Sequence, residues 1–360
     1  MVLTRGDDYP LHQTPEPIAY AGTDRNFYDR YFFNGYAPDG SGFFAAAFGV
    51  YPHLDIADAH FSFIRDGVQH CLHASCELGM ERMALRVGPI SIEVIEPLER
   101  LKVTIEETDG LAGEFTFTAR AAPIEEPRFL HRTGTRAFMD YTRMTQNGHY
   151  EGWIAVDGVR EEMAAGTMGT RDRSWGVRPV GERDPQPIPG APLPSFFWQW
   201  TPLNLETGSV FFHVNADCEG RAWNTRAAWA ADGCGQDAVA EGHGTLAATL
   251  EPGSRWPSGA SLALDVPGAP AALELAPVAR FQMKGIGYTH PEWGHGLHHG
   301  TLRTAREDLV LAELDPAAMD NLHVQMLCRV TGDATGMGVF EQLAIGPYAP
   351  LGLAGIAEPA

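Results

Sequence analysis

The chain has 360 residues, 44% of them hydrophobic, which is enough to bury the core of one large or two medium domains. Its formal charge of -20 repels nucleic acids and anionic membrane surfaces, which argues against polyanionic partners. The five cysteines form no CxxC pair and no zinc-ribbon spacing, and their odd number argues against a secreted disulfide framework. No secretion signal pattern opens the sequence and no apolar run reaches about 18 residues, so we expect a cytoplasmic protein with a poorly ordered N-terminal arm and no membrane span.

In chain order, the first predicted element is a helix over residues 24–33, followed by short apolar stretches that are bounded by turn residues. Several of these stretches alternate cleanly between apolar and polar residues, as strands with one buried face do. The predicted strands of the first half cover residues 43–51, 59–66, 83–88, 90–96, 100–107, 113–120 and 151–158.

A proline-rich stretch over residues 178–195 cannot continue a regular strand and is predicted to be a connector. The domain boundary is therefore predicted there, with one domain over residues 1–184 and a second over residues 185–360. One further helix is predicted over residues 315–322, where Asp315 can act as the N-cap. The predicted strands of the second half cover residues 196–203, 208–217, 227–233, 245–252, 260–266, 271–281, 301–307, 308–314, 323–331 and 338–346.

These patterns predict an all-β protein with few short helices. Two halves of short antiparallel strands favour two β-barrels or sandwiches packed side by side, because closing a sheet removes its exposed edges. Barrels of this size have room for one small apolar ligand. Exposed barrel edges would also be compatible with a homodimer.

The stretch MGTRDRSWGVRP, residues 168–179, concentrates charged residues around Asp172 and Trp175. In a structural role, the flanking Arg171 and Arg173 would form ion pairs with the aspartate and a stacked ring would close a barrel end. In a functional role, Asp172 would be a general acid or base whose pKa the flanking arginines lower. The residue types alone favour the structural role. We expect the stretch to do both, with its arginines holding the fold and Asp172 and Trp175 facing a ligand.

A second candidate region, residues 196–217, is aromatic. Strand alternation places Trp198 and Trp200 on one face, and His213 and Asn215 on one face of the next strand. If these faces point into a barrel, they form an aromatic pocket with one titratable group. The alternative is an aromatic core with a satisfied histidine. The buried amide of Asn215 favours a pocket, since a ligand can supply its partners.

The third candidate region is the glycine-rich stretch GIGYTHPEWGHGLHHG, residues 285–300. It carries Tyr288, His290 and Trp293. We expect a loop at a barrel mouth that offers His290 or Tyr288 for proton transfer.

The sequence contains no recognisable metal or cofactor motif. His295 and His299 are four residues apart, but the glycines around them argue against the helix that would align them, and the order of HExxH is missing. GxGxxG before a helix, GxxxxGK[ST], GxSxG and HxE with PCxxC are also missing. We therefore expect no metal and no tightly bound cofactor.

Residues 169–179, with residues 140–158 before them and GYTHPEWGHG after them, resemble a known superfamily. It is the two-domain lipocalin-like group that includes AttH-like proteins and carotenoid 1,2-hydratases, with fungal lipocalin-like Diels-Alderases as more distant relatives. The resemblance extends over most of the chain, including residues 27–54. Its most specific element is R-D-[RH]-S-W-G at residues 171–176. Arg173 stands where relatives also carry His, and an arginine does not release a proton at neutral pH.

The resemblance implies two lipocalin-like (calycin) barrels side by side, with a hydrophobic ligand bound in or between them. Members of known activity add or remove water, or fold a chain for cyclisation, on molecules such as terpenoids and polyketides and without redox cofactors. The resemblance names no substrate for this chain.

The leading hypothesis is a cofactor-independent lyase of hydratase or dehydratase type, acting on a hydrophobic, aromatic or terpenoid small molecule. Asp172 would be the general acid or base or its orienter, with His213 or His290 as the second proton carrier. Tyr288 would donate a hydrogen bond to a substrate oxygen. The residues expected to bind the substrate are Trp175, Trp198, Trp200, Asn215, Trp293 and, in support, Glu341, whose alternative role is an exposed edge residue or an arginine partner.

Two other hypotheses stay open. An isomerase or cyclase would use the same pocket mainly to hold the substrate in a reactive shape. A non-catalytic carrier of hydrophobic ligands would have few polar groups in its pocket. The distinguishing feature is whether Asp172, His213 and His290 converge on one cavity.

Overall fold

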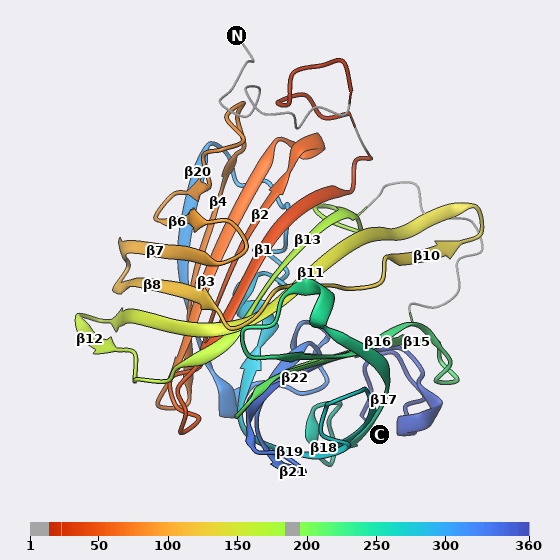
Figure 1. Cartoon of the computed structure of the whole chain (residues 1–360). Coiled ribbons are helices and arrows are strands. Elements are labelled where there is room, and N and C mark those ends of the chain that lie inside the picture. Colours follow the sequence, from red (N-terminus) through yellow and green to blue (C-terminus); the bar gives the residue numbers. More distant parts are fainter. Residues whose placement is uncertain (1–13, 23, 184–194, 360) are drawn as a thin grey trace.

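The computed structural model describes residues 14–22, 24–183 and 195–359. Two large antiparallel β assemblies lie side by side, a broad curved sheet and a closed barrel (Figure 1). The predicted all-β fold with two β units of barrel or sandwich type is confirmed. The predicted N-terminal arm and most of the predicted connector lie outside the described residues.

The sheet has fourteen strands, and its main path runs β20-β4-β3-β2-β1-β13-β11-β8-β7-β6-β5. The strands β9, β10 and β12 pair with the long strand β11. In chain order the strands are β1 (Phe27–Tyr36), β2 (Phe44–Tyr51), β3 (Ile56–Arg65), β4 (Val68–Glu77), β5 (Arg86–Val87), β6 (Ile90–Glu96), β7 (Arg100–Thr108), β8 (Leu111–Ala119), β9 (Ile124–Glu125), β10 (Phe129–Thr133), β11 (Arg136–Val156), β12 (Val159–Glu162), β13 (Met168–Val177) and β20 (Leu302–Val310).

The barrel closes in the order β14-β15-β16-β17-β18-β19-β21-β22. Its strands are β14 (Phe196–Leu205), β15 (Gly208–Ala216), β16 (Ala222–Ala231), β17 (Ala240–Leu250), β18 (Pro257–Asp265), β19 (Ala272–Gln282), β21 (Val324–Gly332) and β22 (Gly336–Ile345). Strand β20 leaves the barrel region and pairs with β4 at the edge of the sheet (Figure 1). We keep the division between residues 184 and 185 as a proposal, with β20 crossing over to the first unit.

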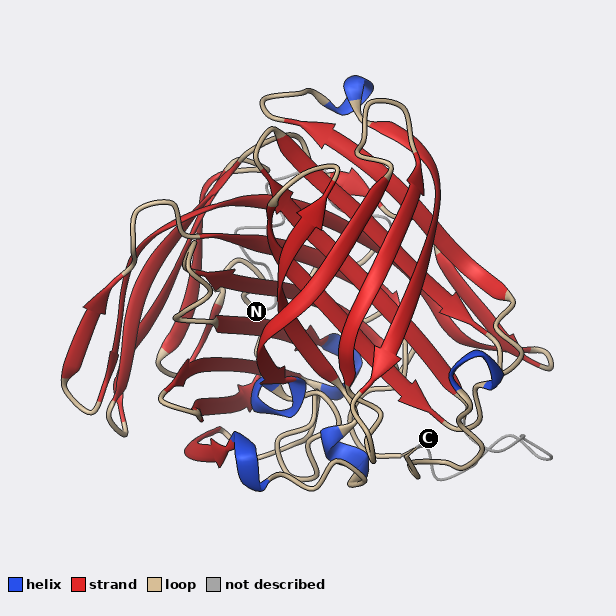
Figure 2. Ribbon diagram, turned by 90° about the horizontal axis from the view of Figure 1, so that it is seen from below, coloured by secondary structure: helices blue, strands red, loops and turns tan. Residues whose placement is uncertain are grey.

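The helices among the described residues are short 3-10 turns (Figure 2). They are η2 (Pro52–Leu54), η3 (Gln236–Ala238), η4 (Met283–Ile286), η5 (Leu311–Glu313), η6 (Met319–Asn321) and η7 (Ala349–Leu351). The helix predicted over residues 315–322 is therefore reduced to η6. None of the described helices is long and apolar enough to cross a membrane.

The helix predicted over residues 24–33 is wrong, because this segment forms β1, which is buried on both faces. Tyr31 and Phe33 belong to the core inside the curved sheet. Tyr28 and Phe32 belong to a second core between the sheet and the barrel. The strand also buries its polar residues Arg30 and Asn34, so it lacks the apolar and polar alternation that identifies a half-buried strand.

Alternation along the barrel strands separates the barrel interior from its outer wall. Leu203, Phe212 and Phe340 fill the interior with other apolar side chains. Trp198 and Trp200 point outward and join the core shared with the sheet. The barrel interior is therefore packed, and the polar and aromatic faces of β14, β15 and β22 meet the sheet.

Buried hydrogen bonds fix the barrel against the sheet. The Asn34 amide of β1 donates to the Gln325 side chain of β21 at 3.0 Å. The Asn147 amide of β11 donates to the backbone carbonyl of Leu203 at 3.0 Å. Such buried amides need partners, so the two units have one favoured relative placement.

Candidate active site

A cavity of about 760 Å³ lies between the sheet and the outer wall of the barrel. On the sheet side, its walls come from β11 and from the segment that follows β13. On the barrel side, they come from β14, β22 and the residue that precedes β21. The segment between η4 and β20 completes the lining. Apolar walls with a few ionisable groups are typical of small-molecule sites. The apolar lining includes Phe138, Met139, Val180, Phe196, Trp198, Leu297, Leu343 and Ile345, and the titratable lining includes Tyr141, Arg143, Arg178, Tyr288, His290, His295, His323 and Glu341.

His323 and Glu341 form a buried hydrogen-bonded pair on the barrel side of this cavity. The Nε2 of His323 lies 2.8 Å from Oε1 of Glu341, and the same oxygen accepts the Trp198 indole N–H at 2.8 Å. The Gln325 amide donates to the other carboxylate oxygen at 2.6 Å. Burial raises the pKa of Glu341, but His323 and these donors outweigh burial and lower the pKa overall. Glu341 is therefore a carboxylate that holds the hydrogen of His323 on Nε2.

The remaining ring nitrogen of His323, Nδ1, is buried and has no hydrogen-bond partner among the described residues. With Nε2 committed to Glu341, Nδ1 of the neutral ring carries the lone pair and can accept a proton. The Tyr288 ring stands edge-on to His323, with the two ring centroids 4.7 Å apart. A base and a phenol thus share one end of the cavity.

Tyr288 is surrounded by cationic and imidazole groups. The Arg30 guanidinium carbon lies 4.4 Å from the centroid of its ring, and that of Arg178 lies 5.6 Å away. The His295 ring is 4.6 Å away, centroid to centroid. This wall of the cavity carries positive charge, which favours negative charge on a nearby oxygen.

Asp172 lies on β13, where it is paired with Phe32 of β1 and Thr145 of β11. It is 8% exposed and faces the barrel, but it does not line the cavity. Burial raises the pKa of Asp172 to about 6, and the opposing effect of Arg143 is smaller. The expectation that its flanking arginines lower this pKa is wrong. The main charge that lowers the pKa of Asp172 is that of Arg143, which does line the cavity.

The neighbours of Asp172 along β13 point to the opposite face of the sheet, as alternation requires. Arg171 donates from Nε to the Gln146 side chain at 2.8 Å, and Arg173 pairs with Asp29. Among the described residues, neither forms an ion pair with the aspartate between them. Trp175 is 39% exposed on that same opposite face, so the structure does not bring it to the cavity.

His213 and Trp200 lie behind the cavity wall, against the buried carboxylate of Glu126. The Trp200 indole donates to this carboxylate at 3.1 Å, Arg143 pairs with it at 3.2 Å, and Nδ1 of His213 lies 3.8 Å away. The Nε2 of His213 lies 2.6 Å from Oδ1 of Asn224, and burial is the main cause that lowers the pKa of this histidine. Neither His213 nor Trp200 lines the cavity, but Arg143 connects both to it.

Asn215 is also on the outer wall of the barrel and is fully buried. Its amide nitrogen donates to the backbone carbonyl of Phe197 at 3.2 Å, and its Oδ1 has no partner among the described residues. The predicted alternation of β14 and β15 therefore exists, with the aromatic faces pointing out of the barrel.

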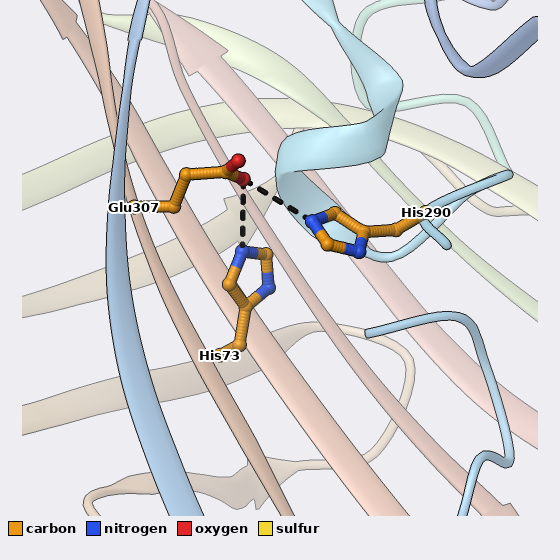
Figure 3. Close-up of side chains that lie close together, drawn as sticks. All are labelled: His73, His290 and Glu307. Carbon is orange, nitrogen blue, oxygen red and sulfur yellow. Dashed lines mark hydrogen bonds and ion pairs between the residues drawn. The ribbon is translucent and has the colours of Figure 1, made fainter. Parts of the chain in front are cut away.

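His290 lines the cavity and belongs to a triad with Glu307 of β20 and His73 of β4 (Figure 3). The Nε2 of His290 lies 3.2 Å from Oε2 of Glu307, and that of His73 lies 3.7 Å from the same oxygen. The other nitrogen of His73 lies 2.9 Å from Nδ1 of the buried His60. Trp293 stacks on His73, with centroids 5.5 Å apart, and covers the triad without lining the cavity.

The three ligand atoms of this triad lie within 4.8 Å of one another, a spacing that suits a divalent cation. However, Nδ1 of His290 accepts the backbone N–H groups of Glu292 at 3.0 Å and Trp293 at 2.7 Å. A histidine that binds a metal through Nε2 carries its hydrogen on Nδ1 and donates it. Here Nδ1 is an acceptor, so Nε2 keeps the hydrogen and donates it to Glu307. The geometry favours a hydrogen-bonded triad over a metal centre.

Known protein families and structures match nearly the whole length of this chain. A family model described as "Family of unknown function (DUF8625)" matches residues 3–354. The chain belongs to this family. No curated protein matches it.

Two solved structures with TM-scores above 0.5 share the fold at low identity. The crystal structure of the AttH-type protein NE1406 from Nitrosomonas europaea is 15% identical in sequence, with a TM-score of 0.55 over 93% of this chain and 98% of that one. CghA with Sch210972 is 11% identical, with a TM-score of 0.51 over 89% of each chain. Kievitone hydratase from Nectria haematococca is 11% identical, with a TM-score of 0.45 over 91% of this chain and 92% of that one. The AttH and CghA likenesses confirm the AttH-like fold that the resemblance implied.

The structure brings together Trp198, Tyr288, His290 and Glu341 of the predicted site residues. Sequence reasoning missed His323, Arg143 and Arg178. The signal for His323 was present, because it opens a predicted strand and shares a strand face with Gln325. Its pairing with Glu341 depends on the register between β21 and β22, which the sequence alone does not supply.

Proposed function

We propose that this member of the family is a cofactor-independent lyase of hydratase or dehydratase type, acting on a hydrophobic small molecule in the cavity between sheet and barrel. The observation that carries the proposal is the His323–Glu341 pair: an oriented imidazole lines an aromatic cavity, and its Nδ1 has no hydrogen-bond partner in the described part of the chain. Orientation of a histidine by a carboxylate is how many enzymes prepare a general base.

In the dehydration direction, Nδ1 of His323 takes a proton from a substrate carbon. The electron pair of that C–H bond forms the C=C bond, the neighbouring C–O bond breaks, and Tyr288 donates a proton to the departing oxygen, which leaves as water. The protonated His323 then returns a proton to Tyr288, so no other reactant is needed. Hydration is the reverse. Glu341 stabilises the imidazolium, and the walls of Trp198 and Leu343 hold the apolar body of the substrate.

Asp172 and His213 act indirectly in this proposal. Both contribute to the electrostatic environment of Arg143, which lines the cavity. His290 shapes this end of the cavity and is not assigned proton transfer, because its Nδ1 accepts two backbone N–H groups and its Nε2 donates to Glu307.

A carrier that only binds hydrophobic ligands is a poorer match. Buried polar groups reduce the affinity of a cavity for apolar ligands unless a ligand uses them. The cavity holds an oriented base, a phenol and two arginines, where a carrier would need few polar groups.

The test is turnover on a panel of terpenoid and aromatic alcohols and the corresponding alkenes, with mass spectrometry to detect gain or loss of one water. Labelled solvent water would mark the oxygen that is added. His323→Gln keeps an N–H donor for Glu341 while removing Nδ1, so we expect it to fold. Its rate should fall by about 10²- to 10⁴-fold. Glu341→Gln should slow the reaction through loss of orientation.

The matched control is His53→Gln, which changes an exposed histidine in η2 and should leave turnover unchanged. Full activity of His323→Gln, with its fold confirmed by circular dichroism, would refute the assignment of the base. Ligand binding without any turnover on the panel would favour the carrier.

A further inference from the structure

Arg178 lines the cavity and forms no ion pair with a carboxylate of the described residues, although the buried Asp58 acts on it electrostatically from a greater distance. Its backbone N–H donates to the carbonyl of Asn26 at 3.2 Å, which holds the chain just after β13. Its guanidinium carbon lies 4.3 Å from the centroid of the Tyr28 ring. Within residues 14–22, 24–183 and 195–359, no carboxylate forms an ion pair with this side chain and no acceptor forms a hydrogen bond with it. Its N–H donors are therefore available to a ligand.

Arg30 adds a second charge behind the same wall. It is 1% exposed and, in the described part of the chain, makes no ion pair with a carboxylate. One terminal nitrogen lies 2.9 Å from Nδ1 of His295. Burial and the nearby arginines hold the pKa of His295 well below its usual range, so this histidine is neutral and compensates no charge.

The arginines of the described residues differ in their partners: Nε of Arg30 and a terminal nitrogen of Arg171 are buried without a hydrogen-bond partner, whereas three others have carboxylate or carbonyl partners. Arg143 pairs with Glu126 at 3.2 Å. Arg120 pairs with Asp232 at 2.8 Å. Arg255 donates to backbone carbonyls, among them that of Gly346 at 2.8 Å. Arg178 differs from these three because no carboxylate or carbonyl of the described residues pairs with its side chain, and it is half-buried at the cavity wall.

The carboxylates that line the cavity do not neutralise this charge. Glu341 is committed to His323 and to two further donors. Glu182 is exposed at the mouth of the cavity and hydrated by solvent. Arg178 is half-buried and lines the cavity, so a ligand that supplies a negative oxygen gains a charge-assisted hydrogen bond there.

We propose, on the basis that the cavity is the substrate site as inferred above, that Arg178 binds an acidic oxygen of an otherwise hydrophobic ligand, with Arg30 reinforcing its charge across Tyr288. A carboxylate or an enolate supplies such an oxygen. The anion lies at the Tyr288 end of the cavity, and the apolar body extends toward Trp198 and Leu343. This places the reacting carbon of an anionic substrate near His323.

The test compares two fluorescent probes of similar shape, anilinonaphthalene sulfonate, which is an anion, and N-phenylnaphthylamine, which is neutral. Equilibrium titration of the full chain should show tighter binding of the sulfonate. Arg178→Gln should weaken the sulfonate by about 10- to 100-fold and the amine by less than about twofold. Arg178→Lys, which keeps the charge, should retain most of the sulfonate affinity.

Two controls fix the site. Arg160→Gln removes the same charge from an exposed arginine paired with Glu162 and should change neither affinity. Leu343→Trp fills the cavity and should weaken both probes. Equal losses of the two probes in Arg178→Gln, unchanged sulfonate binding in that variant, or binding that survives Leu343→Trp would each overturn the proposal. Sulfonate binding that depends on Arg178, without lyase turnover on the panel or on the corresponding hydroxy acids, would favour the carrier and leave the anion site standing.

Discussion

The interior of the barrel and the outer wall of the same barrel are built by the same strands but serve different ends. The interior is filled by side chains such as Leu262, Met326 and Phe340. The outer wall carries His323 and Glu341 and meets the polar face of the sheet. The barrel lumen is therefore a packed core, and the proposed ligand site lies in the seam between the curved sheet and the outer wall of the barrel.

The energetic cost of the ionisable groups buried between the sheet and the barrel supports a functional role for this region. A core made only of apolar side chains is the simpler way to join two units, since every buried ionisable group must be compensated. Burial raises the pKa of both Asp172 and Asp58 to about 6, so the seam keeps carboxyls in an unfavourable setting. Violations of this kind are expected at functional sites.

The largest expected effect is a loss of stability from a substitution in the barrel interior. Phe340→Ala should lower the free energy of unfolding by about 3 to 5 kcal/mol, because it leaves a cavity in the barrel interior. Probe binding at temperatures where the variant is folded should stay within about twofold of the native value. Urea denaturation and the probe titration measure the two quantities. A small loss of stability with a large loss of binding would mean that the lumen, not the seam, holds the ligand.

The next largest effect is the contribution of Asp172 to the pH dependence of the unfolding free energy. A carboxyl with a pKa of 3.8 when unfolded and about 6 when folded binds its proton more tightly in the folded state. The unfolding free energy therefore falls as the pH rises from about 4 to about 6, and the loss persists at neutral pH. Asp172→Asn should remove this penalty and gain about 1 to 3 kcal/mol at pH 7, with the gain shrinking toward pH 4.

Denaturation of both proteins across this pH range checks the prediction. A gain that does not depend on pH would contradict the raised pKa of Asp172, and a large loss at pH 7 would show instead that Asp172 is a stabilising ion-pair partner.

A smaller effect concerns the segment that closes the seam over the sheet. Gly287 has φ of 89°, and a Cβ there would lie 2.7 Å from ring atoms of His60 and His295. Gly287→Ala should cost about 1 to 2 kcal/mol from backbone conformation alone and should also weaken probe binding. Thermal unfolding and probe titration are the measurements, with Gly300→Ala as the control. Gly300 has φ of 83° but open space around its Cβ, so it should lose stability only. Equal losses of binding in the two variants would contradict the close packing of Gly287 against the site.

The smallest effect is expected on the far side of β13. Trp175→Ala removes an exposed ring that the structure places opposite the seam. Its stability should change by less than about 1 kcal/mol and its affinity for both probes should be unchanged. A clear loss of affinity would restore Trp175 to the ligand site, as the sequence motif suggested.

Much of the fold could be predicted from local patterns. The alternation of β7, β8 and β14 is visible in the sequence, and it correctly places Trp198 and Trp200 on one face. The segment Phe27–Tyr36 could not be assigned, because burial on both faces removes the alternation. Strand β4, which carries His73, was missed because its polar residues His70 and His73 are buried.

The site was harder to predict because its pairs are distant in sequence. Tyr288 and His290 stood out by composition, but Glu341 gained its role only through the register that brings it beside His323. The setting of Asp172 also could not be predicted, since strand alternation turned its flanking arginines away and Arg143 from β11 took their place. Local sequence shows which residues share a face of a strand, but the pairing register between distant strands decides which of these faces come into contact.

The most direct test of the central claim is to locate a bound ligand. Crystals of the protein soaked with a bromine-labelled hydrophobic carboxylic acid would give an anomalous peak at the position of the bromine. The peak is predicted in the seam between sheet and barrel, beside Trp198 and Leu343, with the carboxylate toward Arg178. A peak in the barrel lumen among Leu262, Met326 and Phe340, or no ordered ligand in the seam, would contradict the account.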